Sequence, residues 1–114
     1  MIAVIFEVEP RDSARYDYLR IAAELRPLLD EIDGFISIER FQSLSDERRM
    51  LSLSFWRDED AIKQWRTLEA HRAAQSAGRD GLFRDYRLRI AHVVRDYGLN
   101  ERDEAPADSR SVNG

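Results

Sequence analysis

Two histidines, His71 and His92, carry the side chains of this sequence that titrate nearest to neutral pH. His71 falls in a helical segment, where a neutral imidazole could take a proton from a phenol or an enol. The competing interpretation is a partly exposed helix residue bonded to backbone or water. His92 alternates with Ile90 and Val94 on an apolar strand face, where it points either into a pocket or into a sheet interface. We take His71 as the candidate general base and His92 as a candidate substrate-binding residue.

Two glutamates, Glu7 and Glu39, interrupt strands that are otherwise apolar. A carboxylate held in apolar surroundings has a raised pKa and can act as a base. Such residues also pair with arginines across strands, and arginines are plentiful in this chain. Glu7 and Glu39 are therefore candidate substrate-binding residues, with cross-strand ion pairs as the alternative.

The composition of the chain limits the reactive groups, cofactors and partners that it can have. The chain has no cysteine, which removes disulfides and thiolates, and two histidines alone do not make a zinc site. We expect no metal and no cofactor. The net charge of −4 argues against a general nucleic-acid binder, which carries a concentrated basic surface. We find no signal peptide and no apolar run near the roughly 20 residues that cross a bilayer, so we expect a cytoplasmic protein without membrane contact.

Four segments have the composition or alternation of strands. Alternating apolar residues predict a first strand over residues 2–8, ended by Pro10, which cannot donate to a ladder. Residues 35–43 and 50–56 are rich in β-formers and predict a hairpin. Alternation then predicts one long strand over residues 83–97.

Two segments between these strands have the apolar stripe of an amphipathic helix. The first ends at Gly34, and we expect Pro27 to kink or divide it because proline clashes with the preceding turn. The second begins after Asp58, a suitable N-cap. Thr67 resembles a second cap, which predicts a separate helical piece over residues 68–77.

This order predicts one α+β domain with a ferredoxin-like βαββαβ fold and a four-stranded antiparallel sheet. Two helices cover only one face of the sheet, yet both sets of alternating residues in 2–6 are apolar. Because soluble proteins usually bury such a face against a partner, we predict a homodimer with the two sheets face to face. Residues 1–98 form this domain, and residues 99–114 form a polar tail that is either mobile or draped over the partner.

Several stretches carry a wider resemblance that covers residues 1–98. They are IFEV at 5–8, GFISIERF at 34–41, LSLSFW at 51–56, Trp65, EAHRAAQ at 69–75, Gly78-Arg79 and YRLRIA at 86–91. With these stretches the sequence resembles the antibiotic biosynthesis monooxygenase family. The resemblance implies a dimeric α/β barrel built from two ferredoxin-like units.

The resemblance also implies a function, a cofactor-independent monooxygenation of a small aromatic or quinol-type substrate whose anion reacts with O₂. That chemistry needs a base and a dry, aromatic-lined pocket, for which Trp65, Phe83 and Tyr86 are the candidate substrate-binding residues. A non-catalytic dimeric module, ligand-binding or stress-related, is the alternative. Haem degradation is a minor alternative, because that branch of the family needs an Asn on the first strand and a His near position 75. This chain has no Asn before Asn100 and has Gln75.

Overall fold

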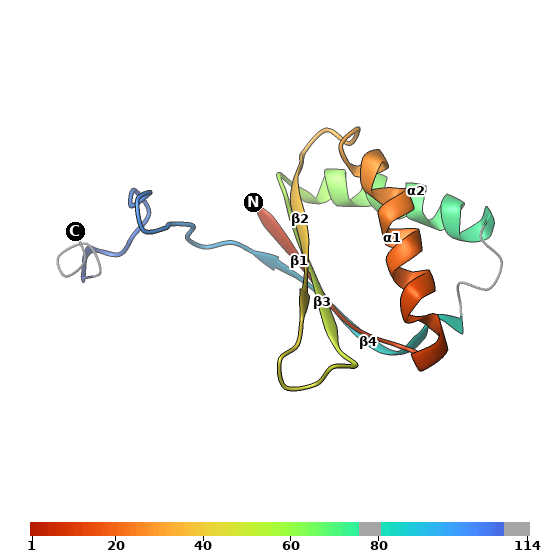
Figure 1. Ribbon diagram of the computed structural model, residues 1–114. Helices are drawn as coiled ribbons and strands as arrows, with labels where there is room; N and C mark the ends of the chain where they lie inside the picture. The colour runs from red at the N-terminus through yellow and green to blue at the C-terminus, as the bar shows by residue number, and fades with distance from the viewer. Residues whose placement is uncertain (76–80, 109–114) are drawn as a thin grey trace.

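The strands and helices follow the order predicted from the sequence. The computed structural model describes residues 1–75 and 81–108, and the side chains of all of these except 69–75. The elements are β1 (Ile2–Pro10), a 3-10 turn (Asp12–Ala14), α1 (Arg15–Leu29), β2 (Phe35–Gln42), β3 (Met50–Trp56), α2 (Glu59–Gln75) and β4 (Phe83–His92) (Figure 1). The α+β, ferredoxin-like fold is confirmed.

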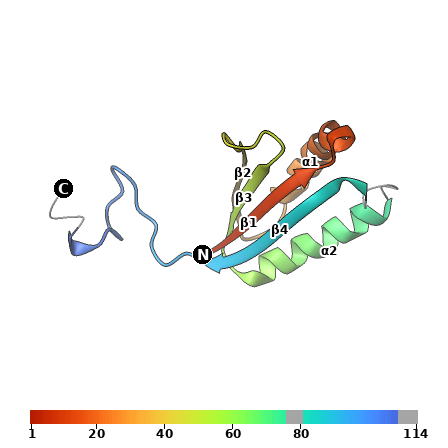
Figure 2. The ribbon, with the colours of Figure 1, turned by 90° about the horizontal axis from the view of Figure 1, so that it is seen from below.

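The four strands form one sheet in the order β2-β3-β1-β4, and every neighbouring pair is antiparallel. Both helices lie on the same face of this sheet (Figures 1 and 2). The register places Phe6 of β1 between Ser52 of β3 and Leu88 of β4. Residues opposite each other point to the same face, so the even-numbered residues of these three strands share one face.

The even-numbered face is the one that the helices cover. Two buried clusters join it to the helices, Ile2, Leu29, Trp56, Ala61 and Ile62 in the first and Val8, Tyr18 and Met50 in the second. The sequence alone could not decide this, because residues of both parities are apolar. Odd-numbered residues of the same strands therefore form the outer face of the sheet.

One helix-end prediction is confirmed and one is wrong. The backbone N–H of Ala61 donates to the Asp58 carboxylate at 3.0 Å, as an N-cap requires. Thr67 does not start a new helix, because its hydroxyl donates to the carbonyl of Lys63 at 3.0 Å inside a continuous α2. Pro27 does not divide α1, which continues to Leu29, so of its two predicted effects only the kink stays a prediction.

Gly34 joins the end of α1 to β2 and to the start of α2. Its φ of 99° lies in the left-handed region, which glycine adopts without strain. Its carbonyl accepts the backbone N–H of Arg57 at 2.7 Å. A Cβ at this position would lie 2.9 Å from the Cβ of Ala61, so the close approach of α2 also depends on glycine here.

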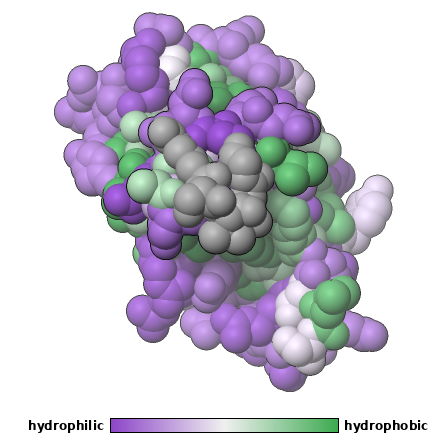
Figure 3. Space-filling model, turned by 90° about the vertical axis from the view of Figure 1, so that its left-hand side faces the viewer, coloured by the Kyte–Doolittle hydropathy of each residue, from purple (hydrophilic) through white to green (hydrophobic). Residues whose placement is uncertain are grey.

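The outer face of the sheet is apolar at its centre. Ile5, Leu51, Leu53 and Phe55 are half-buried there, and the Phe41 side chain is 42% exposed. Figure 3 looks at the side of the molecule away from the helices and shows hydrophobic surface bordered by hydrophilic residues. No helix in the part of the chain that the structure describes is long and apolar enough to cross a membrane.

The last strand is shorter than predicted. β4 ends at His92 and not at Tyr97, because the pairing of β4 with β1 ends opposite Ile2. Val93 still donates its N–H to the carbonyl of Met1 at 3.0 Å, and the chain bends at Val94. The following residues project away from the sheet on the side opposite the helices (Figures 1 and 2).

Candidate functional site

Four aromatic residues meet on the helix-facing side of β1 and β4. They are Phe6 of β1, Tyr18 of α1, and Phe83 and Tyr86 of β4. The ring centroids of Phe6 lie 5.8 Å from Phe83 and 5.7 Å from Tyr86, and those of Tyr18 and Phe83 are 5.6 Å apart. Contacts at these distances and tilted angles are favourable for aromatic pairs. We call these four residues the aromatic cluster.

Next to the aromatic cluster, β4 presents apolar side chains that the helices leave open. Tyr86, Leu88 and Ile90 point to the helix-facing side and are 60%, 51% and 43% exposed. His92 has the same parity and lies exposed at the end of this row. An exposed apolar row bordered by partly buried aromatic rings is the kind of surface on which a small hydrophobic molecule binds. We call Tyr86, Leu88 and Ile90 the open row.

Helix α2 supplies the other sequence-predicted residues on this side of the sheet. Trp65 is partly buried and packs against the first core cluster, which contains Ile2 and Trp56. His71 lies on the same helix, but its side chain is outside the described residues. The structure therefore gathers Phe83 and Tyr86 into one cluster, places Trp65 in the adjoining core and leaves the role of His71 a prediction.

Glu7 and Glu39 lie on the outer face, away from the aromatic cluster. The Glu7 carboxylate lies between two arginines, 3.5 Å from Arg49 and 3.3 Å from Arg89. This is the cross-strand pairing that the sequence offered as the alternative interpretation of Glu7. Glu39 is exposed on β2, and no ion pair joins it to another residue of the described chain.

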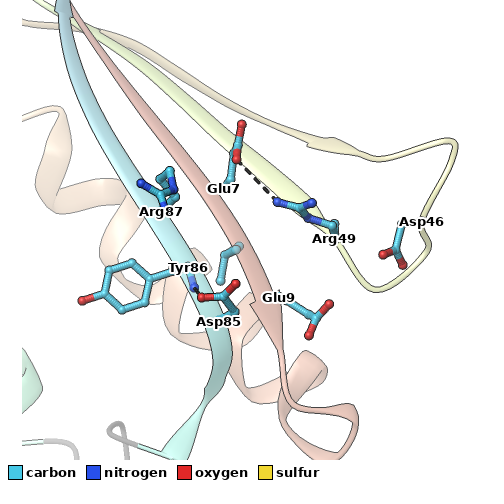
Figure 4. Close-up of a pocket in the computed structure, with 8 residues that line it drawn as sticks. Glu7, Glu9, Asp46, Arg49, Asp85, Tyr86 and Arg87 are labelled. Atoms are coloured by element: carbon cyan, nitrogen blue, oxygen red, sulfur yellow. Dashed lines mark hydrogen bonds and ion pairs between the residues drawn. The ribbon is translucent and has the colours of Figure 1, made fainter.

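A polar pocket of about 160 Å³ lies beside Glu7 on the outer face. Its charged lining consists of Glu7, Glu9, Asp46, Arg49, Asp85 and Arg87 (Figure 4). The hydrogen bond from the Arg48 side chain lowers the pKa of Asp46 below its ordinary value of 3.8. The Tyr86 ring points away from this pocket (Figure 4), so it belongs to the helix-facing site. The pocket offers ionic contacts and not the dry, aromatic surroundings that an oxygenation site needs.

Two residues of the aromatic cluster, Phe6 and Tyr18, were not among the sequence-predicted site residues. Phe6 reads as an ordinary apolar strand residue, and Tyr18 as one position of a helix stripe. Only the register, which puts Phe6 opposite Leu88, brings them to Phe83 and Tyr86. Among the side chains that the structure describes, no group of three or more His, Cys, Asp or Glu residues gathers where it could hold a metal ion.

Fold and site together define a ferredoxin-like α+β protein with an aromatic site between its helices and one face of the sheet. More specifically, the chain belongs to the antibiotic biosynthesis monooxygenase family, whose sequence model matches residues 1–77. The resemblance inferred from the sequence is confirmed.

Two curated relatives agree with this membership. The chain is 50% identical over 101 residues to a Pyricularia oryzae protein named jasmonate monooxygenase ABM, covering 89% of this chain and 47% of that protein. It is 31% identical over 78 residues to the uncharacterized protein YqjZ of Bacillus subtilis, covering 68% of this chain and 67% of that protein. The chain therefore spans about half the length of the Pyricularia relative.

Solved structures share the fold. Rv0793 from Mycobacterium tuberculosis superposes with a TM-score of 0.71 at 16% identity, covering 85% of this chain and 98% of that one. SnoaB, a cofactor-independent oxygenase from Streptomyces nogalater, gives a TM-score of 0.67 at 11% identity, covering 83% of this chain and 94% of that one. At these identities the likeness concerns the backbone architecture alone.

Proposed function

We propose that the chain is a cofactor-independent monooxygenase domain that binds a small hydrophobic substrate against the open row and the aromatic cluster. The observation that carries the proposal is the exposed apolar surface of β4 directly beside the partly buried rings of Phe6 and Phe83. Family membership and the name of the Pyricularia relative support an oxygenase and give jasmonate as the first substrate to test. Quinols and anthrones, which ionise readily, are the second class.

In this proposal, His71 is the general base and Trp65, Phe83 and Tyr86 are substrate contacts. Loss of a proton makes the substrate an electron-rich anion that can react with O₂. Oxidation of a ring CH₂ to C=O by one O₂ releases one water and takes all four electrons from the substrate. Insertion of one oxygen into a C–H bond needs two further electrons from another donor, so the two substrate classes differ in their need for a reductant.

Oxygen uptake tests the proposal. We expect uptake with anthrones or quinols without any reductant, and uptake that appears only with jasmonate and an added two-electron donor would contradict cofactor independence. Replacing a general base typically lowers the rate by about 10²–10⁴, so His71→Ala should lose most activity, whereas Arg66→Ala on the exposed side of α2 should keep it. Uptake that is absent with every substrate, or equal in the two variants, contradicts the assigned chemistry.

Ligand binding tests the site independently of turnover. Because Tyr86 is 60% exposed, a ligand that covers its ring buries up to about 120 Å², worth about 3 kcal/mol. Coverage of half the ring makes binding to Tyr86→Ala roughly tenfold weaker. Tyr16→Ala is the matched control, since Tyr16 is 77% exposed on α1. Ligand binding without oxygen uptake would favour the non-catalytic module instead.

We also propose that the domain works as a homodimer through the outer face of the sheet. The half-buried centre of that face, Ile5, Leu51, Leu53 and Phe55, supports this arrangement, because apolar surface of this kind is usually covered by a partner. Sedimentation at micromolar concentration should report twice the chain mass of 13.3 kDa. Leu53→Asp should shift the protein to the 13.3 kDa species, and a monomeric wild type would refute the dimer.

A further inference from the structure

Arg40 of β2 is a partly buried arginine without a carboxylate partner. It lies opposite Ser52 of β3, so its side chain is on the helix-facing side of the sheet. Its Nε donates to the Tyr18 hydroxyl at 3.4 Å, and its Cζ lies 5.9 Å from the centroid of the Tyr18 ring. In the part of the chain that the structure describes, Arg40 makes no ion pair and no other side-chain hydrogen bond. Because charged groups that leave water are usually paired, its Nη1 and Nη2 are open to a partner from outside the chain.

Two hydroxyl groups accompany Arg40 on this side of the sheet. Tyr18 and Ser52 are each 7% exposed. The Tyr18 oxygen accepts the bond from Arg40, which leaves its own O–H to donate. Ser52 makes no side-chain hydrogen bond within the described residues. A guanidinium has donors only, and its planar fork matches the two oxygens of a carboxylate. These three groups therefore favour a ligand with negatively charged oxygens.

The three donor groups border the aromatic cluster. Tyr18 is a member of that cluster, and its ring centroid lies 5.6 Å from that of Phe83. One ring therefore separates the Arg40 guanidinium from Phe83. Ser52 lies opposite Phe6 of β1, which is another member of the cluster. An apolar surface with a few polar groups at its border is typical of a site that binds a small molecule in one orientation.

We propose that Arg40 binds a carboxylate of the substrate, with the Tyr18 and Ser52 hydroxyls as further donors. The apolar part of the substrate then lies on the aromatic cluster, so the substrate class is an apolar carboxylic acid. This assignment rests on the proposed function, which makes the aromatic cluster part of the substrate site. Arg40 determines which substrate binds and takes no part in the proton transfer assigned to His71.

A purely structural role for Arg40 predicts a different behaviour. In that case its aliphatic stem covers the Tyr18 ring while its charged end stays in water. Replacing Arg40 would then change the stability of the domain, and it would affect the binding of charged and neutral ligands equally. A carboxylic acid and its methyl ester share one apolar body and differ in charge. Comparing the two ligands therefore separates carboxylate binding from packing.

Titration calorimetry of the full chain tests the carboxylate site. The ligands are jasmonate and naphthaleneacetate, each as the free acid and as the methyl ester, at neutral pH. Arg40→Gln should weaken binding of the acids about tenfold or more and binding of the esters less than about threefold, because hydrogen bonds to charged groups are the stronger ones. Arg40→Lys keeps the charge without the planar fork and should give an intermediate loss. The matched control is Arg87→Gln, a strand arginine on the outer face, which should leave all four affinities within about twofold.

The same titrations with Tyr18→Phe test the hydroxyl while the ring is kept. This variant should weaken binding of the acids about threefold to tenfold and leave the esters unchanged. Equal changes for acid and ester in Arg40→Gln, or a wild type that binds neither acid, would overturn the carboxylate site. The proposed oxygenase would still stand if anthrones, which carry no carboxylate, support oxygen uptake. Conversely, a selective loss of acid binding in Arg40→Gln without oxygen uptake from any substrate would support the carboxylate site and overturn the oxygenase.

Discussion

Replacing Gly34 by alanine should destabilise the domain by about 2–4 kcal/mol. Two costs add at this residue. The φ of 99° costs an L-residue about 1–2 kcal/mol. The new methyl group would also lie 2.9 Å from the Ala61 Cβ. That carbon is fixed to the backbone of α2 and cannot rotate away, so overpacking costs a further 1–3 kcal/mol or so. The unfolded state of the variant has less conformational entropy than that of the wild type, which offsets about 0.4–1 kcal/mol of this loss.

Thermal unfolding followed by circular dichroism measures this effect. A domain of this size loses about 4–8 °C per kcal/mol, so Gly34→Ala should lower Tm by roughly 10–25 °C. Gly98→Ala is the matched control, because no atom lies within 4 Å of a Cβ there and its φ is not positive. We expect that change to stay within about 0.5 kcal/mol. Equal Tm values for the two variants would refute the argument.

The steric and conformational parts can be separated with Ala61→Gly. This change removes the methyl group that the new alanine meets, at a cost of about 1 kcal/mol in helix propensity. The double variant should therefore be about 1–2 kcal/mol more stable than the sum of the single effects predicts. Strict additivity would show that the backbone φ alone accounts for the loss. The result bears on function, because this contact sets where α2, with Trp65 and His71, lies against the sheet.

Two further substitutions test the buried polar contact and the helix cap. Ser54→Ala removes the acceptor of the Trp56 indole N–H, a 2.9 Å bond between residues that are 5% and 1% exposed. We expect a loss of about 1–3 kcal/mol by urea unfolding monitored by tryptophan fluorescence, and an unchanged midpoint would contradict it. The pKa of Asp58 is lowered from 3.8 by the backbone N–H of Ala61 and then by Arg57. Because its folded pKa is lowered, ionised Asp58 stabilises the domain above pH 3.8. This stabilisation is lost as the pH falls through the folded pKa. Asp58→Asn keeps a cap and should flatten the loss of stability as the pH falls from 3.8 through the lower folded pKa, whereas an unchanged pH profile would argue against the cap.

Periodicity predicted the elements of this fold because each one buries a regular stripe. Even-numbered residues of β1 and the stripe of α1 meet in the core, so alternation and helical spacing were sufficient. The wrong predictions of helix and strand ends arose where the local sequence is compatible with two structures. Thr67 can cap a helix or bond to the preceding turn, and the local sequence does not decide between them. The end of β4 depends on where β1 begins, because His92 lies opposite Ile2, and the sequence of β4 does not contain this information.

The site was less predictable than the fold because it depends on parity and register. Phe83 and Tyr86 were expected, but Phe6 joins them only through the pairing of β1 with β4. Glu7 has the opposite parity and so lies across the sheet with Arg49 and Arg89. A charged residue in an apolar strand does not by itself indicate which face of the sheet it occupies.

Strand β1 connects the proposed substrate site to the proposed dimer interface. Phe6 contacts the aromatic cluster, while Ile5 and Glu7, its neighbours along the strand, point to the outer face. Alternation means that contacts made by Ile5 in a dimer fix the same backbone that positions Phe6. Substrate binding and dimerisation should then favour each other by the same factor, as thermodynamic linkage requires. Sedimentation with saturating substrate should therefore give a lower dimer dissociation constant than without it. An identical constant in the two measurements would show that the two faces of β1 act independently.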